Sequence, residues 1–277
     1  MRALIRYQGG KRRMAGAIVE ALDLGSARPY AEPFVGAGAV YVEARRRRWR
    51  GPAVLGDVNA GVVAAWTCLH DPDLAAELLE ALAVRATWER TNARYLEAAA
   101  EPPPERLPEL AATWWWLSFA GFGGKPVSPA VGRWRHHGAA FDWHRERHGR
   151  LGPSAKGSSP MLFGVMVERA RELARALAGA PTEVYLADHR DLPIAPAAAV
   201  YADPPYAGTT GYRAGDAGDV LRWAARLEVA GPVVVSWGNP VELPAWEVRE
   251  GRARDGQSLD KLGGGGTRRE VLLVRRW

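Results

Sequence analysis

Two spacings of hydrophobic residues divide the chain into predicted strands and helices. Short apolar runs that end at turn-forming residues predict strands, and longer stretches with apolar residues every three or four positions predict helices. The predicted strands are a short one at Tyr30 before a Gly-x-Gly turn, then 53–55, 182–187, 197–202 and 233–237, with a hairpin of arms 246–252 and 270–276 joined by a flexible turn at 263–266. The predicted helices are 14–24, closed by Gly25, then one from the Gly-x-Gly turn to about Trp49, 60–70, a helical stretch 71–99, 110–120, 161–178 and 219–229. Strands that alternate with helices in this way are typical of an α/β fold.

Residues 121–160 follow neither pattern. Basic residues are interleaved with aromatic ones there, and no strand or helix period holds. A connection of this length is uncommon in a compact domain, and cations beside aromatic rings are typical of nucleic-acid contacts. We therefore predict a core domain of residues 1–66 and 180–277, interrupted by a mainly helical binding insertion of residues 67–179.

The charge and the cysteine content narrow the class of protein. The chain of 277 residues has a net charge of +6, and almost all of the basic excess is arginine, which favours a polyanionic partner. Cys68 is the only cysteine, so an intrachain disulfide and a cysteine metal cluster are excluded. No apolar run approaches the ~20 residues of a membrane span, and residues 1–6 lack the apolar region of a signal peptide. We expect a cytoplasmic, nucleoid-associated protein with no membrane partner.

The sequence Asp203-Pro204-Pro205-Tyr206 directly follows a predicted strand. Two consecutive prolines end sheet pairing and make a rigid loop at the carboxyl end of the strand, where ligands of open α/β sheets bind. Asp203 and the Pro204 carbonyl are hydrogen-bond acceptors, and Tyr206 offers a stacking face. These groups suit a planar ligand with an NH2 group, such as a nucleobase. A turn with an N-capping aspartate is the competing interpretation.

Residues near the N-terminus indicate a nucleoside site. Gly36 and Gly38 form a Gly-x-Gly turn between a strand and a helix, where small residues let a ligand approach the backbone. Asp57 lies about twenty residues beyond that turn, a spacing typical of an acid that accepts the hydroxyls of a ribose. Lys11 lies near the start of a predicted helix, a place suited to anions. Each residue also has an ordinary interpretation as turn or capping chemistry.

Taken together, four blocks of the sequence resemble the Dam-like DNA adenine methyltransferases, an S-adenosylmethionine-dependent family. The blocks are Tyr7-Gln8-Gly9-Gly10-Lys11, which is similar to the N-terminal cofactor motif, Glu32-Pro33-Phe34-Val35-Gly36-Ala37-Gly38, similar to the glycine-rich motif, Gly56-Asp57-Val58-Asn59, similar to the ribose-binding segment, and Asp203-Pro204-Pro205-Tyr206, similar to the catalytic loop. The order of the blocks also fits the family, whereas residues 67–185 match it poorly.

The resemblance implies a fold, a reaction and a set of site residues. The fold is a Rossmann-like methyltransferase sheet with helices on both faces. The reaction is methyl transfer from S-adenosylmethionine to the exocyclic amino group of a flipped-out adenine in duplex DNA, with no metal. The implied catalytic residues are Asp203, Pro204 and Tyr206. The implied cofactor-binding residues are Tyr7, Lys11 for the methionine carboxylate, Phe34, Gly36, Gly38, Asp57 for the ribose, and Asp188 for the adenine amino group, with Asp191 as the alternative to Asp188.

Arginines in the irregular region are the candidate DNA contacts, namely Arg133, Arg135, Arg145, Arg147 and Arg150. His136, His137, His144 and His148 lie in the same region, but no carboxylate or cysteine pattern accompanies them, so we predict no metal site. The expected partner is double-stranded DNA, and a cognate restriction endonuclease is a candidate second partner. We expect a monomer or a weak dimer.

Other functions remain open. An RNA methyltransferase would use the same catalytic tetrapeptide, although the Gly9-Gly10-Lys11 block and the long basic region favour DNA. A non-catalytic DNA-binding module is a second alternative, and the intact Asp203 and Tyr206 argue against it. A nicotinamide dehydrogenase would leave Asp-Pro-Pro-Tyr unexplained.

Overall fold

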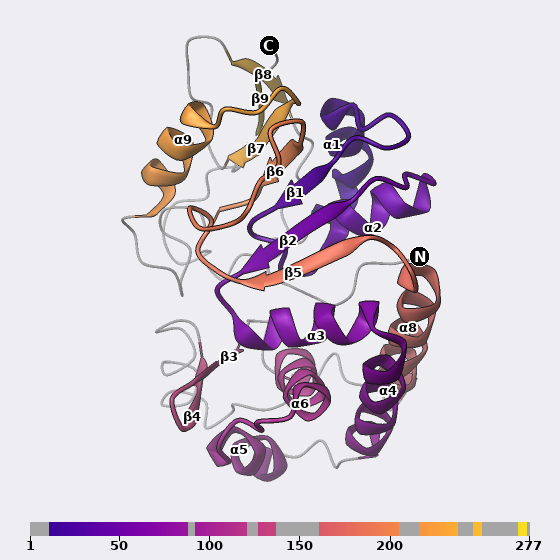
Figure 1. The fold of residues 1–277 in the computed structure, drawn as a ribbon. Helices are drawn as coiled ribbons and strands as arrows, with labels where there is room; N and C mark the ends of the chain where they lie inside the picture. The colour runs from indigo at the N-terminus through magenta and orange to yellow at the C-terminus, as the bar shows by residue number, and fades with distance from the viewer. Residues whose placement is uncertain are drawn as a thin grey trace.

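The protein is described by a computed structural model. The structure describes residues 11–87, 92–120, 127–136, 161–204, 216–237, 246–250 and 271–275. Figure 1 shows a twisted sheet with helices packed against it, and a second group of helices beside the β5 edge of the sheet. The flexible turn predicted at 263–266 lies outside the described residues.

The sheet is mostly parallel. Its seven strands are β1 Tyr30–Glu32, β2 Ala53–Asp57, β5 Thr182–Leu186, β6 Ala199–Ala202, β7 Val233–Trp237, β8 Glu247–Glu250 and β9 Val271–Arg275. They lie in the order β5-β2-β1-β6-β7-β9-β8, and only β9 runs antiparallel to its neighbours β7 and β8. Strand order therefore reverses beside β1, and ligands of such sheets bind at this switch point, at the carboxyl ends of the strands. The predicted α/β class is confirmed.

The described helices are η1 Lys11–Arg13, α1 Ala15–Leu22, α2 Ala39–Arg46, α3 Ala60–His70, α4 Pro72–Ala86, α5 Asn92–Ala100, α6 Leu107–Ala120, α8 Met161–Leu177 and α9 Asp216–Arg226. Side-chain caps begin two of the described helices, α3 and α4. Asn59 caps α3, because its side chain accepts a hydrogen bond from the Gly61 N–H. Asp71 caps α4 in the same way, with Pro72 at the first helical position. None of the described helices combines the length and the apolar composition that crossing a membrane requires.

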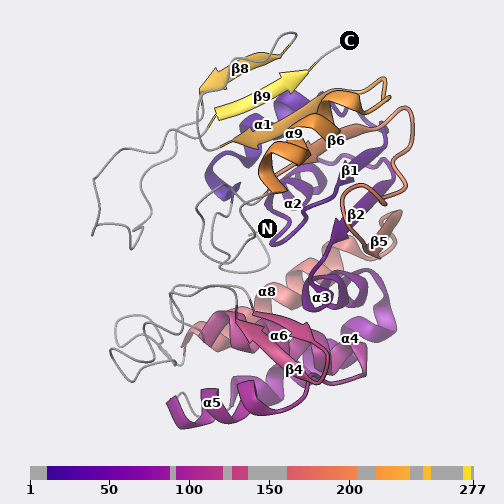
Figure 2. The ribbon, with the colours of Figure 1, turned by 90° about the vertical axis from the view of Figure 1, so that its left-hand side faces the viewer.

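Helices cover both faces of the sheet. Tyr30, Tyr201 and Val234 belong to a core that includes α1 and α2. Their strand neighbours, such as Ala31 and Val235, point the other way and pack in a separate core with α9. Figure 2 shows α9 in front of the sheet and α1 and α2 behind it. Every residue of β6 and β9 is buried, as expected for strands covered on both faces.

The second group of helices contains α3, α4, α6 and α8, which pack on one another (Figure 1). Its centre is aromatic, because Trp114, Trp115 and Trp116 of α6 are all buried. The boundary between residues 1–66 and 67–179 stays a prediction.

A β-hairpin lies within the region for which the sequence predicted no regular period. Its strands are β3 Val127–Ala130 and β4 Arg133–His136, joined at Val131 and Gly132. The pattern is weak because the side chains of Val127 and Trp134 are buried while Val131 and Arg133 are exposed. Gly132 takes a positive φ of 67°, which allows the tight turn. Residues 127–136 therefore form regular strands although their sequence shows poor strand or helix periodicity.

Helix ends also differ from the predictions. α1 ends at Leu22, and Asp23 rather than Gly25 takes the capping left-handed conformation, with φ of 44°. The Asp23 carbonyl accepts a hydrogen bond from Arg28 at 2.6 Å, which holds this turn. α2 ends at Arg46 instead of Trp49, since Arg48 takes a φ of 67°. α9 runs over 216–226 rather than 219–229.

Candidate active site at the carboxyl ends of the strands

Acidic side chains gather at one edge of the parallel strands. Glu32 and Asp57 end β1 and β2, while Asp188 and Asp203 follow β5 and β6. Because parallel strands bring their carboxyl ends to the same edge, these residues from distant parts of the sequence lie at the switch point. This edge is where the sequence predicted the site.

Lys11 and Asp203 form an ion pair at this edge. The Nζ of Lys11 lies 2.7 Å from Oδ2 of Asp203, and the two side chains are only 5% and 21% exposed. With water largely excluded, removal of either partner would leave a buried charge without its counter-ion, which is costly. The sequence assigned Lys11 to the cofactor's methionine carboxylate. In the structure its anionic partner is Asp203, and the cofactor role stays a prediction.

Glu32 is a buried acid that the sequence analysis did not single out. Its side chain is 2% exposed, and Oε2 accepts a hydrogen bond from the Tyr30 hydroxyl at 2.8 Å. Burial raises the pKa of Glu32 to about 8, the Tyr30 hydrogen bond opposes the rise, and the charges of Asp203 and Asp57 add to it. Glu32 therefore holds a proton at neutral pH. Its place at the end of a predicted strand, at the same edge as Asp57, was the available signal.

The glycine turn between β1 and α2 is fixed on two sides. The Gly36 N–H donates to Oδ2 of Asp57 at 3.0 Å, and the Gly36 carbonyl accepts from the Trp66 indole at 3.0 Å. Gly36 and Gly38 both take positive φ, of 43° and 59°. A Cβ at Gly38 would lie 2.1 Å from the Trp66 ring. Only glycine meets both demands at position 38, so the turn presents bare backbone at the start of α2.

Asp57 is oriented by the backbone around it. Its Oδ2 accepts from Gly36, and its Oδ1 accepts from the Asn59 N–H at 2.9 Å. Burial raises the pKa of Asp57 to about 6, and hydrogen bonds from Asn59, Gly36 and Val58 oppose the rise. The carboxylate is thus held at the switch point in one orientation and is ionised above pH 6, the form that accepts hydroxyl hydrogens from a ribose.

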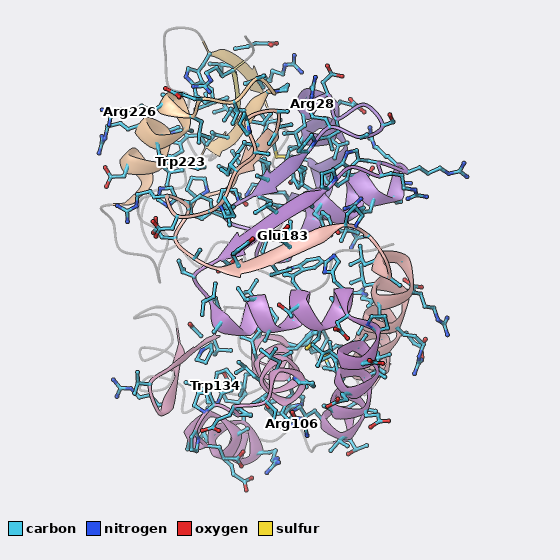
Figure 3. The ribbon with its side chains drawn as sticks, in the orientation of Figure 1. Arg28, Arg106, Trp134, Glu183, Trp223 and Arg226 are labelled. Carbon is cyan, nitrogen blue, oxygen red and sulfur yellow. The ribbon has the colours of Figure 1, made fainter. Side chains whose placement is uncertain are left out.

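Asp188 is held through a single oxygen. Oδ1 accepts from Nε of Arg190 at 2.7 Å and from its N–H at 3.1 Å, and it lies 3.1 Å from Nδ1 of His189. The Arg190 side chain is the main reason that the pKa of Asp188 is lowered. His189 is buried between Phe34 and Trp223 of α9, with ring centroids 5.2 and 5.0 Å away. Trp223 is labelled in Figure 3. Asp188 therefore lies beside an aromatic cluster, while Asp191 is exposed.

The structure brings most of the described predicted site residues to this edge, namely Lys11, Phe34, Gly36, Gly38, Asp57, Asp188, Asp203 and Pro204. Arg133 is elsewhere, exposed on the hairpin, next to the buried Trp134 (Figure 3). The predicted residues Tyr7, Tyr206, Arg145, Arg147 and Arg150, and the side chain of Arg135, lie outside the described part of the chain.

Comparison with protein families gives a match to the N-terminal part of the chain. Residues 7–133 match the model of the D12 class N6 adenine-specific DNA methyltransferase family. A search of curated proteins gave no significant match. The matched segment contains Lys11, the glycine turn and Asp57, and Asp203 follows at the adjacent strand end. This similarity, which spans just under half of the chain, supports an adenine-specific DNA methyltransferase enzyme of the D12 class.

Proposed function

We propose that this enzyme transfers the methyl group of S-adenosylmethionine to the N6 amino group of an adenine that has left the duplex. The observation that carries the proposal is the position of Asp203. It stands at the carboxyl end of β6, directly before Pro204, at the switch point of the sheet, and it is paired with Lys11. The family match supports adenine in DNA as the substrate.

The residues at the switch point fit S-adenosylmethionine. The turn at Gly36 and Gly38 leaves backbone without side chains at the start of α2. Asp57 would accept the ribose hydroxyls. Arg190 holds Oδ1 of Asp188, so Oδ2 would accept a hydrogen bond from the amino group of the cofactor's adenine, beside the rings of Phe34 and His189. When bound, the cofactor supplies an electrophilic methyl group on its sulfonium.

The protein's part in the chemistry is to position the target amino group. That nitrogen is conjugated with the adenine ring and is a poor nucleophile. Hydrogen bonds from its two hydrogens to Asp203 and the Pro204 carbonyl draw it toward a geometry with a directed lone pair. The amino nitrogen would take the methyl group as the carbon–sulfur bond breaks and S-adenosylhomocysteine leaves as a neutral thioether. The Asp203 carboxylate would stabilise the positive charge on the nitrogen until water takes up the released proton. The ion pair with Lys11 holds that carboxylate in place.

Access to the base requires DNA contacts outside the catalytic edge. Unstacking the adenine costs a few kcal/mol, and stacking on Tyr206 would return ~1–3 kcal/mol. We propose residues 67–179 as the recognition region, with Arg133, which is exposed on the hairpin, as a candidate DNA contact. A bidentate guanine contact from such an arginine is worth ~1–3 kcal/mol of discrimination.

The test is to express the protein in a host without DNA methylation and to locate modified adenines by long-read sequencing. We expect N6-methyladenine at one short sequence with the wild type, none with Asp203→Asn, and wild-type levels with Asp219→Asn, which changes an exposed carboxylate of α9. Tritiated-methyl transfer to purified duplex DNA and to rRNA is measured in parallel. Label in rRNA alone would overturn the proposal.

A further inference from the structure

Asn59 uses both polar ends of its side chain. The residue is 5% exposed and lies between β2 and α3. Its Oδ1 accepts from the Gly61 N–H at 3.0 Å, and its Nδ2 donates to the carbonyl of Val127 at 2.8 Å. Capping α3 explains Oδ1, but serine or aspartate would cap equally well. Of the two side-chain bonds, only that to Val127 requires an amide.

Val127 is the base of the β3–β4 hairpin. Its carbonyl accepts from Asn59 and also from the Trp114 indole of α6 at 2.8 Å. The residue is 1% exposed, so both bonds are shielded from water. At the other end of the hairpin, Val131 and Arg133 are exposed. The hairpin is therefore anchored at its base and presents its tip outward.

Asn59 also touches the acid of the nucleoside site. Its backbone N–H donates to Oδ1 of Asp57 at 2.9 Å. Short hydrogen bonds thus run from the Asp57 carboxylate through Asn59 to the Val127 carbonyl, between residues far apart in sequence. A buried donor or acceptor that loses its partner is costly, so displacement at one end of this chain is opposed at the other.

We infer that Asn59 is a positioning residue that couples occupancy of the cofactor site to the placement of the DNA-contacting hairpin. The inference rests on the proposed function, in which Asp57 binds the cofactor and the hairpin meets DNA. Ribose hydroxyls that donate to Asp57 fix the carboxylate, and Asn59 passes that restraint to Val127. When one ligand is bound, the other finds its own site already in the bound arrangement. Each ligand therefore binds more tightly when the other is present.

Two variants remove the bond to Val127 and keep the helix cap. Asn59→Asp retains the size of the side chain and replaces the donor Nδ2 with an oxygen that repels the Val127 carbonyl. Asn59→Ser caps α3 but is too short to reach Val127. Asp71→Asn is the matched control, because it exchanges the same two residue types at the cap of α4, away from the hairpin. Thermal melting establishes that each variant is folded.

The measurement is the Kd of S-adenosylhomocysteine by calorimetry, alone and with a saturating duplex that carries the methylation site found by sequencing. We expect DNA to tighten binding about tenfold in the wild type and in Asp71→Asn. In Asn59→Asp and Asn59→Ser, the ratio of the Kd without DNA to the Kd with DNA should fall below about twofold. The Kd in the absence of DNA should change less than about threefold.

Two results would overturn the inference and leave the proposed function intact. One is that DNA tightens S-adenosylhomocysteine binding in both Asn59 variants as much as in the wild type, or that DNA leaves the Kd of the wild type unchanged. The other is loss of S-adenosylhomocysteine binding without DNA in both variants, since Asn59 would then belong to the cofactor site itself. The proposed function fails separately, when the wild type transfers no methyl group to DNA.

Discussion

The Nζ of Lys11 lies 2.7 Å from Oδ2 of Asp203, which joins the N-terminal block to the catalytic loop. We expect Lys11→Gln to lower kcat by about 10- to 100-fold, because a hydrogen bond between charged groups is worth about 1.5–3 kcal/mol. Steady-state methylation with saturating substrates gives kcat, with Arg12→Gln as the control that removes the neighbouring exposed cation. An unchanged kcat with weakened S-adenosylhomocysteine binding would instead support the methionine-carboxylate role.

Glu32 should make stability depend on pH. The pKa of Glu32 is raised from 4.5 to about 8 on folding, so the folded state retains a proton that the unfolded chain loses above pH 4.5. The contribution of Glu32 to the free energy of unfolding is fully present below pH 4.5. It is lost as pH rises through 8, at about 1.4 kcal/mol per pH unit. Between pH 5 and 8 the free energy of unfolding of Glu32→Gln should therefore fall less than that of the wild type, by on the order of 3–4 kcal/mol.

Urea unfolding at pH 5, 6, 7 and 8 provides the check for Glu32, and Glu43→Gln is the control. Hydrogen bonds from Arg46 and Arg47 lower the pKa of Glu43 to about 2, so its contribution is lost only as pH falls toward 2. Glu43→Gln should shift the whole curve from pH 5 to 8 by a constant amount. Parallel curves for Glu32→Gln and the wild type would contradict a buried proton on Glu32.

Cofactor affinity should depend on the ionisation of Asp57. The pKa of Asp57 is about 6, so about nine tenths of the carboxyl is protonated at pH 5 and accepts hydroxyl hydrogens poorly. The Kd of S-adenosylhomocysteine should rise about tenfold from pH 7 to pH 5. Asp57→Asn should bind weakly at both values, with no such change. The same rise in Asp57→Asn would assign the titration to another group.

Arg133 should contribute to DNA binding without affecting the cofactor. If it contacts a phosphate, Arg133→Gln should reduce the slope of log K against log salt by about 0.9, and the loss of affinity should be similar for all duplex sequences. Fluorescence anisotropy between about 50 and 200 mM salt measures this. Arg226→Gln, an exposed arginine of α9, is the charge-matched control (Figure 3). Equal slopes for the two variants would remove Arg133 from the interface.

The close packing of α3 on α6 gives a prediction on stability. A Cβ at Gly61 would lie 2.3 Å from the Trp114 ring, whereas a Cβ at Gly164 of α8 meets nothing within 4 Å. Gly61→Ala should cost about 1–3 kcal/mol or more through overpacking, although alanine favours helices. Gly164→Ala should stabilise by about 0.5–1 kcal/mol. Chemical denaturation measures both, and a gain in stability at Gly61 would contradict the packing.

The sequence predicts this fold where the signal is local. Apolar runs that end at Asp57 and Asp203 give both the strands and the edge at which their carboxylates lie. The partners of those acids are set by contacts across the sequence and have no local signal. Lys11 reaches Asp203, and Asn59 reaches Val127, 68 positions away. The proton on Glu32 likewise depends on burial by residues from several elements.

β9 lies between β7 and β8, although β8 comes earlier in the chain. As the protein leaves the ribosome, Lys11, Asp57 and Asp203 emerge well before residues 271–275. Until those residues arrive, β8 has no partner in the sheet and β7 has an open edge, which invites pairing with other nascent chains. Arg275 then donates to the carbonyls of Ala225 and Leu227, which ties β9 to the end of α9. The order of synthesis thus makes the last strand the step that completes the sheet.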